Sequence, residues 1–350
     1  MRRGTAVAAS GFVVSLVVSL LAAELAVRGL GLLDRVAPFP RQLFRAGDAP
    51  DLPYRLTPGA DVQLGDVRVR VNRFGLRGEE IEPRPSPGTR RWLVLGDSVA
   101  YGHLLPESDS LPVRLERELR RRGRVVEVLN GAAPGYNTSA EFAFLRDVGL
   151  GLAPDGVILA VSLNDFGPAP ELGSLGFLVD PPAGFDWGPA WLEERSELYA
   201  LLRWAVSYLR MGGLPGRGGE NARGEAAWAA LDRAVAAQHK RFYAKPAGPG
   251  WQSVRRSLRA IRDLTAEHAI ALVVAVFPEQ DQVGAEPLNL DPQARWRGLC
   301  EELGLRCVDL WPAFADAALA PGEPLFSDAQ HPSPRGLEIS ARALAEAVDL

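Results

Sequence analysis

The sequence predicts an α/β fold with a mainly parallel central sheet, and three observations support this prediction. Short apolar runs of strand length alternate along the chain with amphipathic stretches of helical spacing. The first three of these runs are residues 92–95, 125–130 and 156–161, and each ends in a loop of small or polar residues. The chain has 350 residues, 47% of them hydrophobic, which is enough for a large core. Since strand–helix alternation favours right-handed parallel crossovers, these loops are expected to meet in one crevice.

An apolar run covers residues 4–23 and is followed by Glu24. About 20 apolar residues are enough to cross the hydrocarbon core of a bilayer as a helix. We therefore expect residues 1–33 to form an uncleaved membrane anchor, with the remaining chain outside the cytoplasmic membrane. A cleaved signal is the alternative, although its best cleavage site, residues 21–23, has leucine where a small residue is usual.

The orientation of this helix depends on the arginines that flank it. Arg2 and Arg3 favour a cytoplasmic amino terminus. Four arginines on the other side weaken that bias: Arg28, Arg35, Arg41 and Arg45.

Charge and cysteine content bear on the partners of the chain. The formal net charge of −4 gives no indication of a nucleic-acid partner. The two cysteines, Cys300 and Cys307, lack the paired spacing of a zinc site. They fit either a local disulfide or two buried free thiols.

A linker and an accessory strand segment are expected over residues 34–89. The prolines at positions 38 to 58 predict an extended linker that packs along the domain. Strict alternation over residues 67–72 predicts a strand with one exposed face. The glycines of residues 72–78 then suit a tight turn.

Residues 90–350 are expected to form one α/β domain. Five apolar runs predict buried strands at residues 92–95, 125–130, 156–161, 271–277 and 306–310. Helical spacing predicts helices over residues 111–122, 139–148, 251–268 and 293–303, and a terminal helix from Arg335.

An insertion over about residues 166–250 interrupts this alternation. Helices are expected over residues 191–209 and 226–243, with a glycine-rich loop at 212–224 between them. The insertion fits a lid or substrate-recognition subdomain and fits a packing elaboration equally well.

The candidate nucleophile is Ser98, which follows the first buried strand in the run Gly96-Asp97-Ser98. In open α/β sheets, chemistry is found at the carboxyl ends of the strands. A simple turn explains the same three residues when they are taken alone.

A serine nucleophile needs a histidine base that a third group orients. His331 lies in a proline-rich loop with Asp328 three residues earlier, so one turn can carry both groups. His103, five residues after Ser98, is a minor candidate for lining the site. The remaining histidines, His239 and His268, are expected to be solvated.

Acyl transfer also needs preorganised donors for the oxyanion, each worth roughly 3–4 kcal/mol. Three groups can supply them: the backbone N–H of Ser98, the backbone N–H of Gly135 and the side-chain amide of Asn164. Taken singly, Gly135 also fits a plain turn and Asn164 a cap at a strand end.

The chain resembles the SGNH hydrolases, also called GDSL-type esterases and lipases. Four signatures occur in the family's order: Gly96-Asp97-Ser98, Asn130-Gly131 through Gly135, Asn164-Asp165, and Asp328 through His331. The resemblance spans about residue 90 to the end, apart from the insertion. One departure is Ser162, which stands where the family usually has glycine.

The resemblance implies a flavodoxin-like three-layer α/β/α sandwich and specific roles for the residues. Ser98 is the implied nucleophile, His331 the general base and Asp328 its orienting acid. Ser98, Gly135 and Asn164 form the implied oxyanion hole. The anchor and residues 72–78 resemble bacterial, membrane-anchored members, some of which modify extracytoplasmic polysaccharides.

The function expected from the sequence is a serine ester hydrolase that acts through an acyl-enzyme outside the cytoplasmic membrane. Its expected substrate is an acyl ester on a polysaccharide or lipid of the cell envelope, with no metal or organic cofactor. One alternative is an O-acyltransferase that uses the same three side chains. The other is a non-catalytic binding protein of envelope assembly, against which intact Ser98, Asp328 and His331 count.

Overall fold

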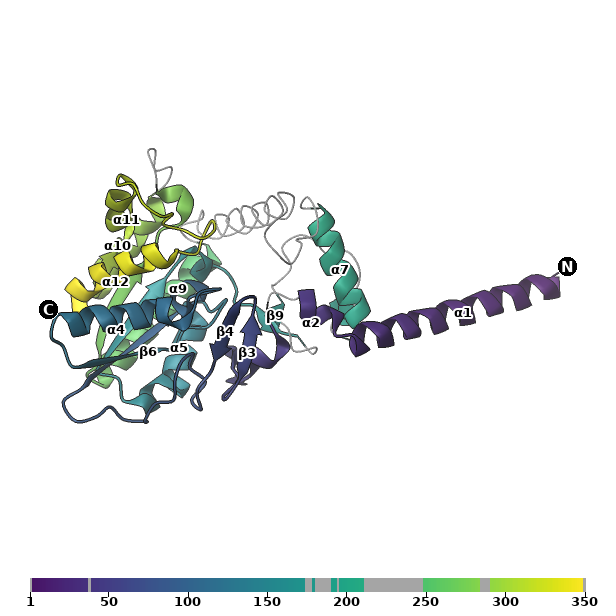
Figure 1. Cartoon of the computed structure of the whole chain (residues 1–350), viewed down its shortest axis with the longest axis horizontal. Coiled ribbons are helices and arrows are strands. Elements are labelled where there is room, and N and C mark those ends of the chain that lie inside the picture. The colour runs from purple at the N-terminus through teal and green to yellow at the C-terminus, as the bar shows by residue number, and fades with distance from the viewer. Residues whose placement is uncertain are drawn as a thin grey trace.

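A five-stranded parallel sheet forms the centre of the protein (Figure 1). The computed structural model describes residues 2–36, 39–173, 178–179, 190–193, 195–210, 248–283 and 290–348. The strands of the sheet are β5 (Arg90–Gly96), β6 (Val126–Asn130), β7 (Gly156–Val161), β10 (Ala271–Val276) and β11 (Arg306–Asp309). Their order is β11-β10-β7-β5-β6, and every neighbouring pair is parallel. The predicted mixed α/β fold with a parallel sheet is therefore confirmed.

Helices cover both faces of this sheet. The long ones are α4 (Leu111–Arg121), α5 (Thr138–Asp147), α9 (Pro249–Glu267), α10 (Asp291–Leu303), α11 (Trp311–Ala318) and α12 (Pro334–Val348). The connection from β5 to β6 moves outward and the connection from β6 to β7 moves back across β5. Right-handed crossovers therefore place α4 and α5 on opposite faces. Because α12 packs beside α4 and α9 beside α5, the protein has three layers.

Short helical turns sit in the connections of the sheet. They are α3 (Ser98–Tyr101), η1 (Arg41–Leu43), η2 (Glu107–Asp109), η3 (Gly149–Leu152), η4 (Leu163–Phe166) and η5 (Gln280–Gln282). Two of them, α3 and η4, directly follow the carboxyl ends of β5 and β7, where the sequence predicts the site.

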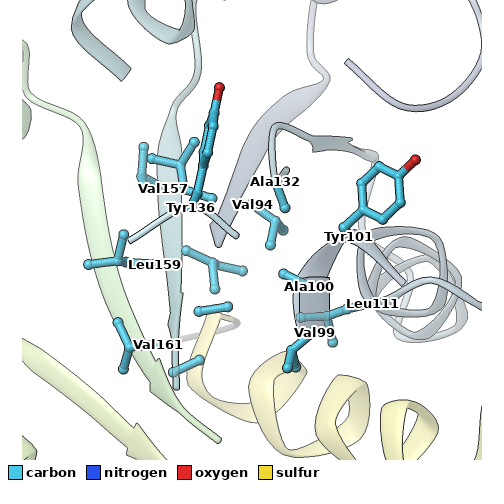
Figure 2. Close-up of a cluster of buried hydrophobic side chains, with 14 of the residues drawn as sticks. Val94, Val99, Ala100, Tyr101, Leu111, Ala132, Tyr136, Val157, Leu159 and Val161 are labelled. Carbon is cyan, nitrogen blue, oxygen red and sulfur yellow. The ribbon is translucent and has the colours of Figure 1, made fainter. Parts of the chain in front are cut away.

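The central strands are apolar on both faces, because helices cover both sides of the sheet. All six residues of β7 are buried, and so are the last six residues of β5. Figure 2 shows Val94 of β5 and Leu159 of β7 in one cluster of buried side chains with Tyr136. This packing fixes the strand ends from which the loops of the candidate site begin.

Two hairpins precede the sheet. β1 (Phe44–Ala49) pairs antiparallel with β2 (Leu52–Leu56), and β3 (Asp61–Leu64) pairs antiparallel with β4 (Val67–Arg70). The strand predicted at residues 67–72 is confirmed as β4. The prediction of an extended linker is wrong for residues 44–56, which form the first hairpin. Leu52, Tyr54 and Leu56 are buried in the core, and this burial outweighs the missing N–H of Pro53.

The amino-terminal helix α1 (Arg2–Gly29) projects from the rest of the protein, and the short helix α2 (Leu32–Val36) follows it (Figure 1). Its segment Ser10–Gly29 is long and apolar enough to be a membrane span or a signal sequence.

The structure describes part of the predicted insertion. The two-residue strands β8 (Glu171–Leu172) and β9 (Leu178–Val179) pair antiparallel, and the helices α6 (Ala190–Glu193) and α7 (Glu197–Arg210) follow. The sequence predicts a single helix over residues 191–209, and the structure has these two helices instead, with residues 195 and 196 non-helical. The loop predicted at 212–224, the helix predicted at 226–243 and His239 lie outside the described residues.

A disulfide joins Cys300 of α10 to Cys307 of β11. The structure thus selects one of the two states that the sequence left open. The bridge ties the edge strand of the sheet to the helix that precedes it in the chain.

Replacing both cysteines by alanine is expected to lower the free energy of unfolding by about 2–3 kcal/mol, because a bridge removes entropy from the unfolded chain. A denaturant titration without reductant measures this difference. A reducing agent should destabilise the native protein by a similar amount and leave the Cys300→Ala/Cys307→Ala variant unchanged. Equal stability of the two proteins without reductant would contradict the bridge.

Candidate active site

Ser98 is presented by a sharp turn between β5 and α3. The turn depends on Gly96, whose φ of 156° favours glycine. A Cβ at this position would lie 2.8 Å from the Cβ of Ala100 and 2.9 Å from the backbone oxygen of Ala160. Asp97 then caps α3, since its Oδ1 accepts a hydrogen bond of 2.8 Å from the backbone N–H of Val99. Ser98 is the first residue of the helix.

The structure brings Ser98, His331 and Asp328 together in one hydrogen-bonded series. The distance from His331 Nε2 to Ser98 Oγ is 2.9 Å, although 233 positions separate the two residues. On the other side of the ring, His331 Nδ1 lies 2.6 Å from Asp328 Oδ2. The side chains of His331 and Asp328 are 19% and 23% exposed, so solvent reaches them.

Asp328 also shapes the loop that carries the histidine. Its Oδ1 accepts hydrogen bonds from the backbone N–H groups of Gln330 (2.8 Å) and His331 (2.7 Å). Burial alone would raise the pKa of the Asp328 carboxyl, but the hydrogen bond and charge of His331 and these backbone donors lower the pKa to about 2. The carboxylate is therefore ionised at neutral pH.

Hydrogen bonds join the loops that carry the four sequence signatures. Asp97 Oδ2 accepts a hydrogen bond of 2.7 Å from the hydroxyl of Ser162, at the end of β7. The backbone N–H of Ala133 donates to the oxygen of Gly96 at 3.1 Å. Gln280, after β10, donates its backbone N–H to the oxygen of Ala329 at 3.0 Å. The serine at position 162, where the family usually has glycine, thus has a partner in the turn that presents Ser98.

Gly135 lies in a turn of the loop after β6, closed by a hydrogen bond from the N–H of Tyr136 to the oxygen of Ala133. Its φ is 80°, and a Cβ there would lie 2.7 Å from Pro170 and 2.8 Å from the Tyr54 hydroxyl. Glycine is therefore required both by conformation and by close packing. Asn164 lies in η4, and its side chain is outside the described part of the structure.

Tyr54 of β2 supports the Gly135 turn, a contact that the sequence did not predict. Its hydroxyl donates a hydrogen bond of 2.6 Å to the backbone oxygen of Pro134. In return, the Tyr136 hydroxyl donates to the backbone oxygen of Tyr54 at 2.7 Å. Both rings are buried, and burial raises the pKa of Tyr136, so its hydroxyl stays protonated.

Arg77 supports the segment after Ser98 in a similar way. Its guanidinium donates to the backbone oxygens of Tyr101 (2.8 Å), Gly102 (2.7 Å) and Leu105 (2.5 Å). The guanidinium carbon also lies 4.6 Å from the ring centroid of Tyr101. The sequence indicated only a turn over residues 72–78, and an arginine between glycines there was the one available signal.

His103 lies next to His331, as expected for a residue that lines the site. The two ring centroids are 4.9 Å apart, and the Phe39 ring lies 5.2 Å from His103 on another side. Burial first, and the charge of His331 second, lower the pKa of His103 to about 3, so the ring is neutral at neutral pH. His268 is exposed, in agreement with the prediction that it is solvated.

Acidic side chains are buried behind the nucleophile turn. Asp165 accepts hydrogen bonds from the Thr138 hydroxyl (2.6 Å) and the backbone N–H of Ser162 (2.8 Å). Burial and the charge of Asp97 raise the pKa of Asp165 to about 7, against the opposing effect of these donors. Glu141 is fully buried, and neither of its carboxyl oxygens has a partner among the described residues. Burial, together with the charges of Asp165 and Asp97, raises its pKa well above the ordinary value.

Metal ligation has no evident place in this part of the molecule. Within the described ranges, no group of three or more His, Cys, Asp or Glu side chains is arranged to hold a metal ion.

A parallel α/β sheet with a hydrogen-bonded serine, histidine and aspartate at its carboxyl edge is an arrangement found in hydrolases. The chain belongs to the GDSL-like lipase/acylhydrolase family, whose model it matches over residues 94–339. This match confirms the resemblance that the four signatures carried, and membership implies hydrolysis of acyl esters. No curated protein sequence matches the chain.

Several solved structures are similar to this chain at low sequence identity. A GDSL-like lipase from Bacteroides thetaiotaomicron is 11% identical, with coverage of 74% of this chain and 88% of that one and a TM-score of 0.36. An acetylxylan esterase from Geobacillus stearothermophilus is 14% identical, with coverage of 75% and 94% and a TM-score of 0.40. An alpha/beta hydrolase enzyme from the metagenome of Lake Arreo, Spain, is 15% identical, with coverage of 74% and 95% and a TM-score of 0.43.

The buried Glu141 leads to a prediction about pH and stability. Because its pKa is raised in the folded state, the folded protein binds more protons than the unfolded chain above pH 4.5, the ordinary value. The free energy of unfolding should therefore fall as pH rises from 4.5 towards the pKa of the folded state. The Glu141→Gln variant lacks this titrating group. Its free energy of unfolding should therefore fall less than that of the native protein between about pH 5 and about pH 8.

Denaturant titrations of both proteins at the two pH values measure the effect. Glu346→Ala, which removes an exposed carboxylate from α12, is the control and should follow the native pH dependence. Parallel curves for the native protein and Glu141→Gln would show that this carboxyl is ionised in the folded state.

Proposed function

We propose that the protein is a serine ester hydrolase in which Ser98 is the nucleophile, His331 the general base and Asp328 the acid that orients it. The observation that carries this proposal is the 2.9 Å distance between Ser98 Oγ and His331 Nε2. A serine hydroxyl becomes a nucleophile when a base lies at this distance and a third group holds the other ring nitrogen. The 2.6 Å contact between His331 Nδ1 and Asp328 supplies that third group.

In the proposed reaction, Ser98 Oγ bonds to the carbonyl carbon of the ester while its proton moves to His331 Nε2. The bond to the alcohol oxygen then breaks, and that oxygen takes the proton from His331. Water attacks the acyl-enzyme, gives a proton to His331, and the free acid leaves as Ser98 recovers its proton. The Asp328 carboxylate, whose pKa is lowered to about 2, stabilises the imidazolium that forms twice in this cycle.

The proposed oxyanion hole consists of the backbone N–H groups of Ser98 and Gly135 and the side-chain amide of Asn164. Preorganised donors of this kind stabilise the charge that develops on the carbonyl oxygen. Support comes from the position of Gly135, whose turn is fixed by Tyr54 and lies beside the nucleophile turn through the bond between Ala133 and Gly96. The neutral ring of His103 adds no positive charge that would oppose protonation of His331.

We further propose that α1 remains attached as an anchor and that the hydrolase domain lies outside the cytoplasmic membrane. The apolar length of α1 supports an anchor, and Arg2 and Arg3 support a cytoplasmic amino terminus. The last turns of α1 also belong to the folded protein, since Val27 is 5% exposed. The proposed substrates are acyl esters of envelope glycans or lipids.

Ser98→Ala is expected to reduce p-nitrophenyl acetate hydrolysis by at least about 10³-fold, because the nucleophile is lost while the fold remains. A fluorophosphonate probe should label the native protein at Ser98 and leave the variant unlabelled. Ser108→Ala, an exposed serine in the same connection, is the control and should keep both activities.

Equal hydrolysis by the native protein and Ser98→Ala would refute the proposed nucleophile. Absence of probe labelling together with absence of hydrolysis would favour a non-catalytic binding protein. Product analysis in the presence of a polysaccharide acceptor separates hydrolysis, which yields free acid, from transfer, which yields acylated polysaccharide.

Tyr54→Phe is expected to lower kcat with little change in KM. The change leaves the buried Pro134 oxygen without its donor, at a cost of about 1–3 kcal/mol, and loosens the turn that carries the Gly135 N–H. Tyr101→Phe is the matched control, since the Tyr101 hydroxyl is buried without a partner among the described residues. Steady-state kinetics of the three proteins tests the role of the turn. An unchanged kcat in Tyr54→Phe would exclude it.

A further inference from the structure

The end of α1 is joined to the insertion through the carboxylate of Glu24. Its Oε2 accepts hydrogen bonds from the Ser196 hydroxyl (2.7 Å) and the backbone N–H of Leu198 (3.0 Å). Its Oε1 accepts from the backbone N–H of Glu197 (3.0 Å). Three donors at the start of α7 thus converge on one side chain of α1, which acts as a cap supplied by a distant helix.

A second set of polar contacts joins α7 and α2 to the chain that enters β1. Arg41, the first residue of η1, binds Asp34 of α2 through two hydrogen bonds of 2.7 Å. The same guanidinium lies 3.0 Å from the carboxylate of Glu197, which is buried. We call α2, η1, the last two turns of α1 and the first turn of α7 the junction. It fixes the direction in which α1 leaves the hydrolase domain.

The junction lies close to the candidate site along the chain and in space. Phe39, two residues before Arg41, has its ring 5.2 Å from His103, which lies 4.9 Å from His331. Phe39 is only ten positions after Gly29, the last residue of α1. Ten extended residues span at most about 35 Å, and the helical turn of α2 shortens this span. The site is therefore held within a short distance of the end of α1.

The candidate site also lies on the side of the molecule from which α1 projects. α12 begins at Pro334, three residues after His331, and its carboxyl end lies on the side opposite α1 (Figure 1). A helix of 15 residues is about 22 Å long, so the His331 end of α12 is the end that faces α1. The carboxyl edge of the sheet, where Ser98 lies, faces the same way.

The surface at the junction has the composition of a membrane interface. Large apolar side chains are exposed there: Leu25 (70%), Leu30 (58%), Trp191 (58%) and Leu202 (50%). The arginines Arg28 and Arg195 lie beside them, joined by a hydrogen bond from Arg28 to the backbone oxygen of Arg195. Tryptophan and arginine are favoured where apolar core meets anionic headgroups. α7 crosses the end of α1 at a steep angle, as an amphipathic helix on the bilayer surface would (Figure 1).

Glu24 sets the depth at which the chain leaves the bilayer. A carboxylate is costly inside the hydrocarbon core, and the backbone donors that it binds belong to α7. The membrane surface therefore lies near Glu24, and residues 4–23 remain as the span. This length agrees with about 20 residues for a core of about 30 Å.

We propose that the junction holds the candidate site open towards the adjoining bilayer surface, and that its substrate is an acyl ester carried by a membrane-embedded amphiphile. This inference rests on the proposed serine hydrolase function. Ser98 Oγ would bond to the acyl carbon, the amphiphile's oxygen would leave with the proton held by His331, and water would release the acid. The short connection keeps the site at the bilayer surface. The effective concentration of embedded esters at the site is therefore higher than that of soluble esters.

The test uses the full chain reconstituted into vesicles of phosphatidylethanolamine and phosphatidylglycerol. Three esters are compared: soluble p-nitrophenyl acetate, a phosphatidylglycerol with a fluorogenic acyl chain, and an O-acetylated octadecyl glucoside in the same vesicles. The last two distinguish a phospholipid ester from a lipid-borne sugar ester, and turnover of either supports the inference.

Two variants change the junction and leave Ser98, His331 and Asp328 unchanged. The first variant, Glu24→Ala, removes the cap on α7. The second variant combines Glu24→Ala with a flexible Gly-Ser insertion of about twelve residues between Leu30 and Gly31. In the second variant, turnover of the vesicle-borne ester should fall at least about tenfold, while p-nitrophenyl acetate turnover stays within about twofold. Glu346→Ala, at the far end of α12, is the matched control and should change neither.

Equal turnover of the vesicle-borne esters by the native protein and the second variant would overturn the inference. So would hydrolysis of p-nitrophenyl acetate by the native chain with no turnover of either embedded ester. A parallel loss of activity on all three esters would assign the junction a purely structural role and overturn it as well. Failure of the hydrolase proposal gives a different result, because neither p-nitrophenyl acetate hydrolysis nor probe labelling of Ser98 would then occur.

Discussion

The parallel direction of the five central strands is the constraint on which the candidate site depends. Parallel strands have their carboxyl ends at one edge, so the loops after β5, β6, β7 and β10 all begin there. Polar contacts then join these loops to one another, as the Asp97 carboxylate does when it binds both the Val99 N–H and the Ser162 hydroxyl. A buried carboxylate with two donors fixes the turn that presents Ser98, and the last loop of the chain brings His331 to it.

The segment before the family-matched region completes the site from outside the sheet. Backbone oxygens in the loops after β5 and β6 point away from the regular ladders and need donors when they are buried. Tyr54 provides one for Pro134, and Arg77 provides donors for Tyr101, Gly102 and Leu105. The first hairpin, through Tyr54, and the turn after the second hairpin, through Arg77, are therefore a structural part of the hydrolase.

The same segment connects the site to α1 and supports the loops of the site, so one piece of chain has both roles. Phe39 lies against His103, Arg41 binds the two helices of the junction, and Tyr54 follows in the first hairpin. A rigid connection of this kind restricts the directions from which a substrate approaches.

The sequence by itself determined the sheet, most of the helices and the identity of the series Ser98, His331 and Asp328. Apolar periodicity is a local property of the chain and can be read from the sequence. Three of the four signatures lie at or just after the ends of predicted strands, so their place in the sheet could be predicted as well. The prediction from the sequence was wrong for the first hairpin, because Pro50 and Pro53 obscure the alternation of Leu52, Tyr54 and Leu56. Only the tertiary structure decided that Tyr54 supports the Gly135 turn, that Glu24 caps α7 and that the two cysteines are joined. It also decided that Glu141 is buried without a hydrogen-bond partner among the described residues. The contacts of Tyr54 and Glu24 join residues that are distant in the sequence and that only packing brings together. The local sequence around a hydroxyl or carboxylate does not tell whether that group becomes buried or stays in water.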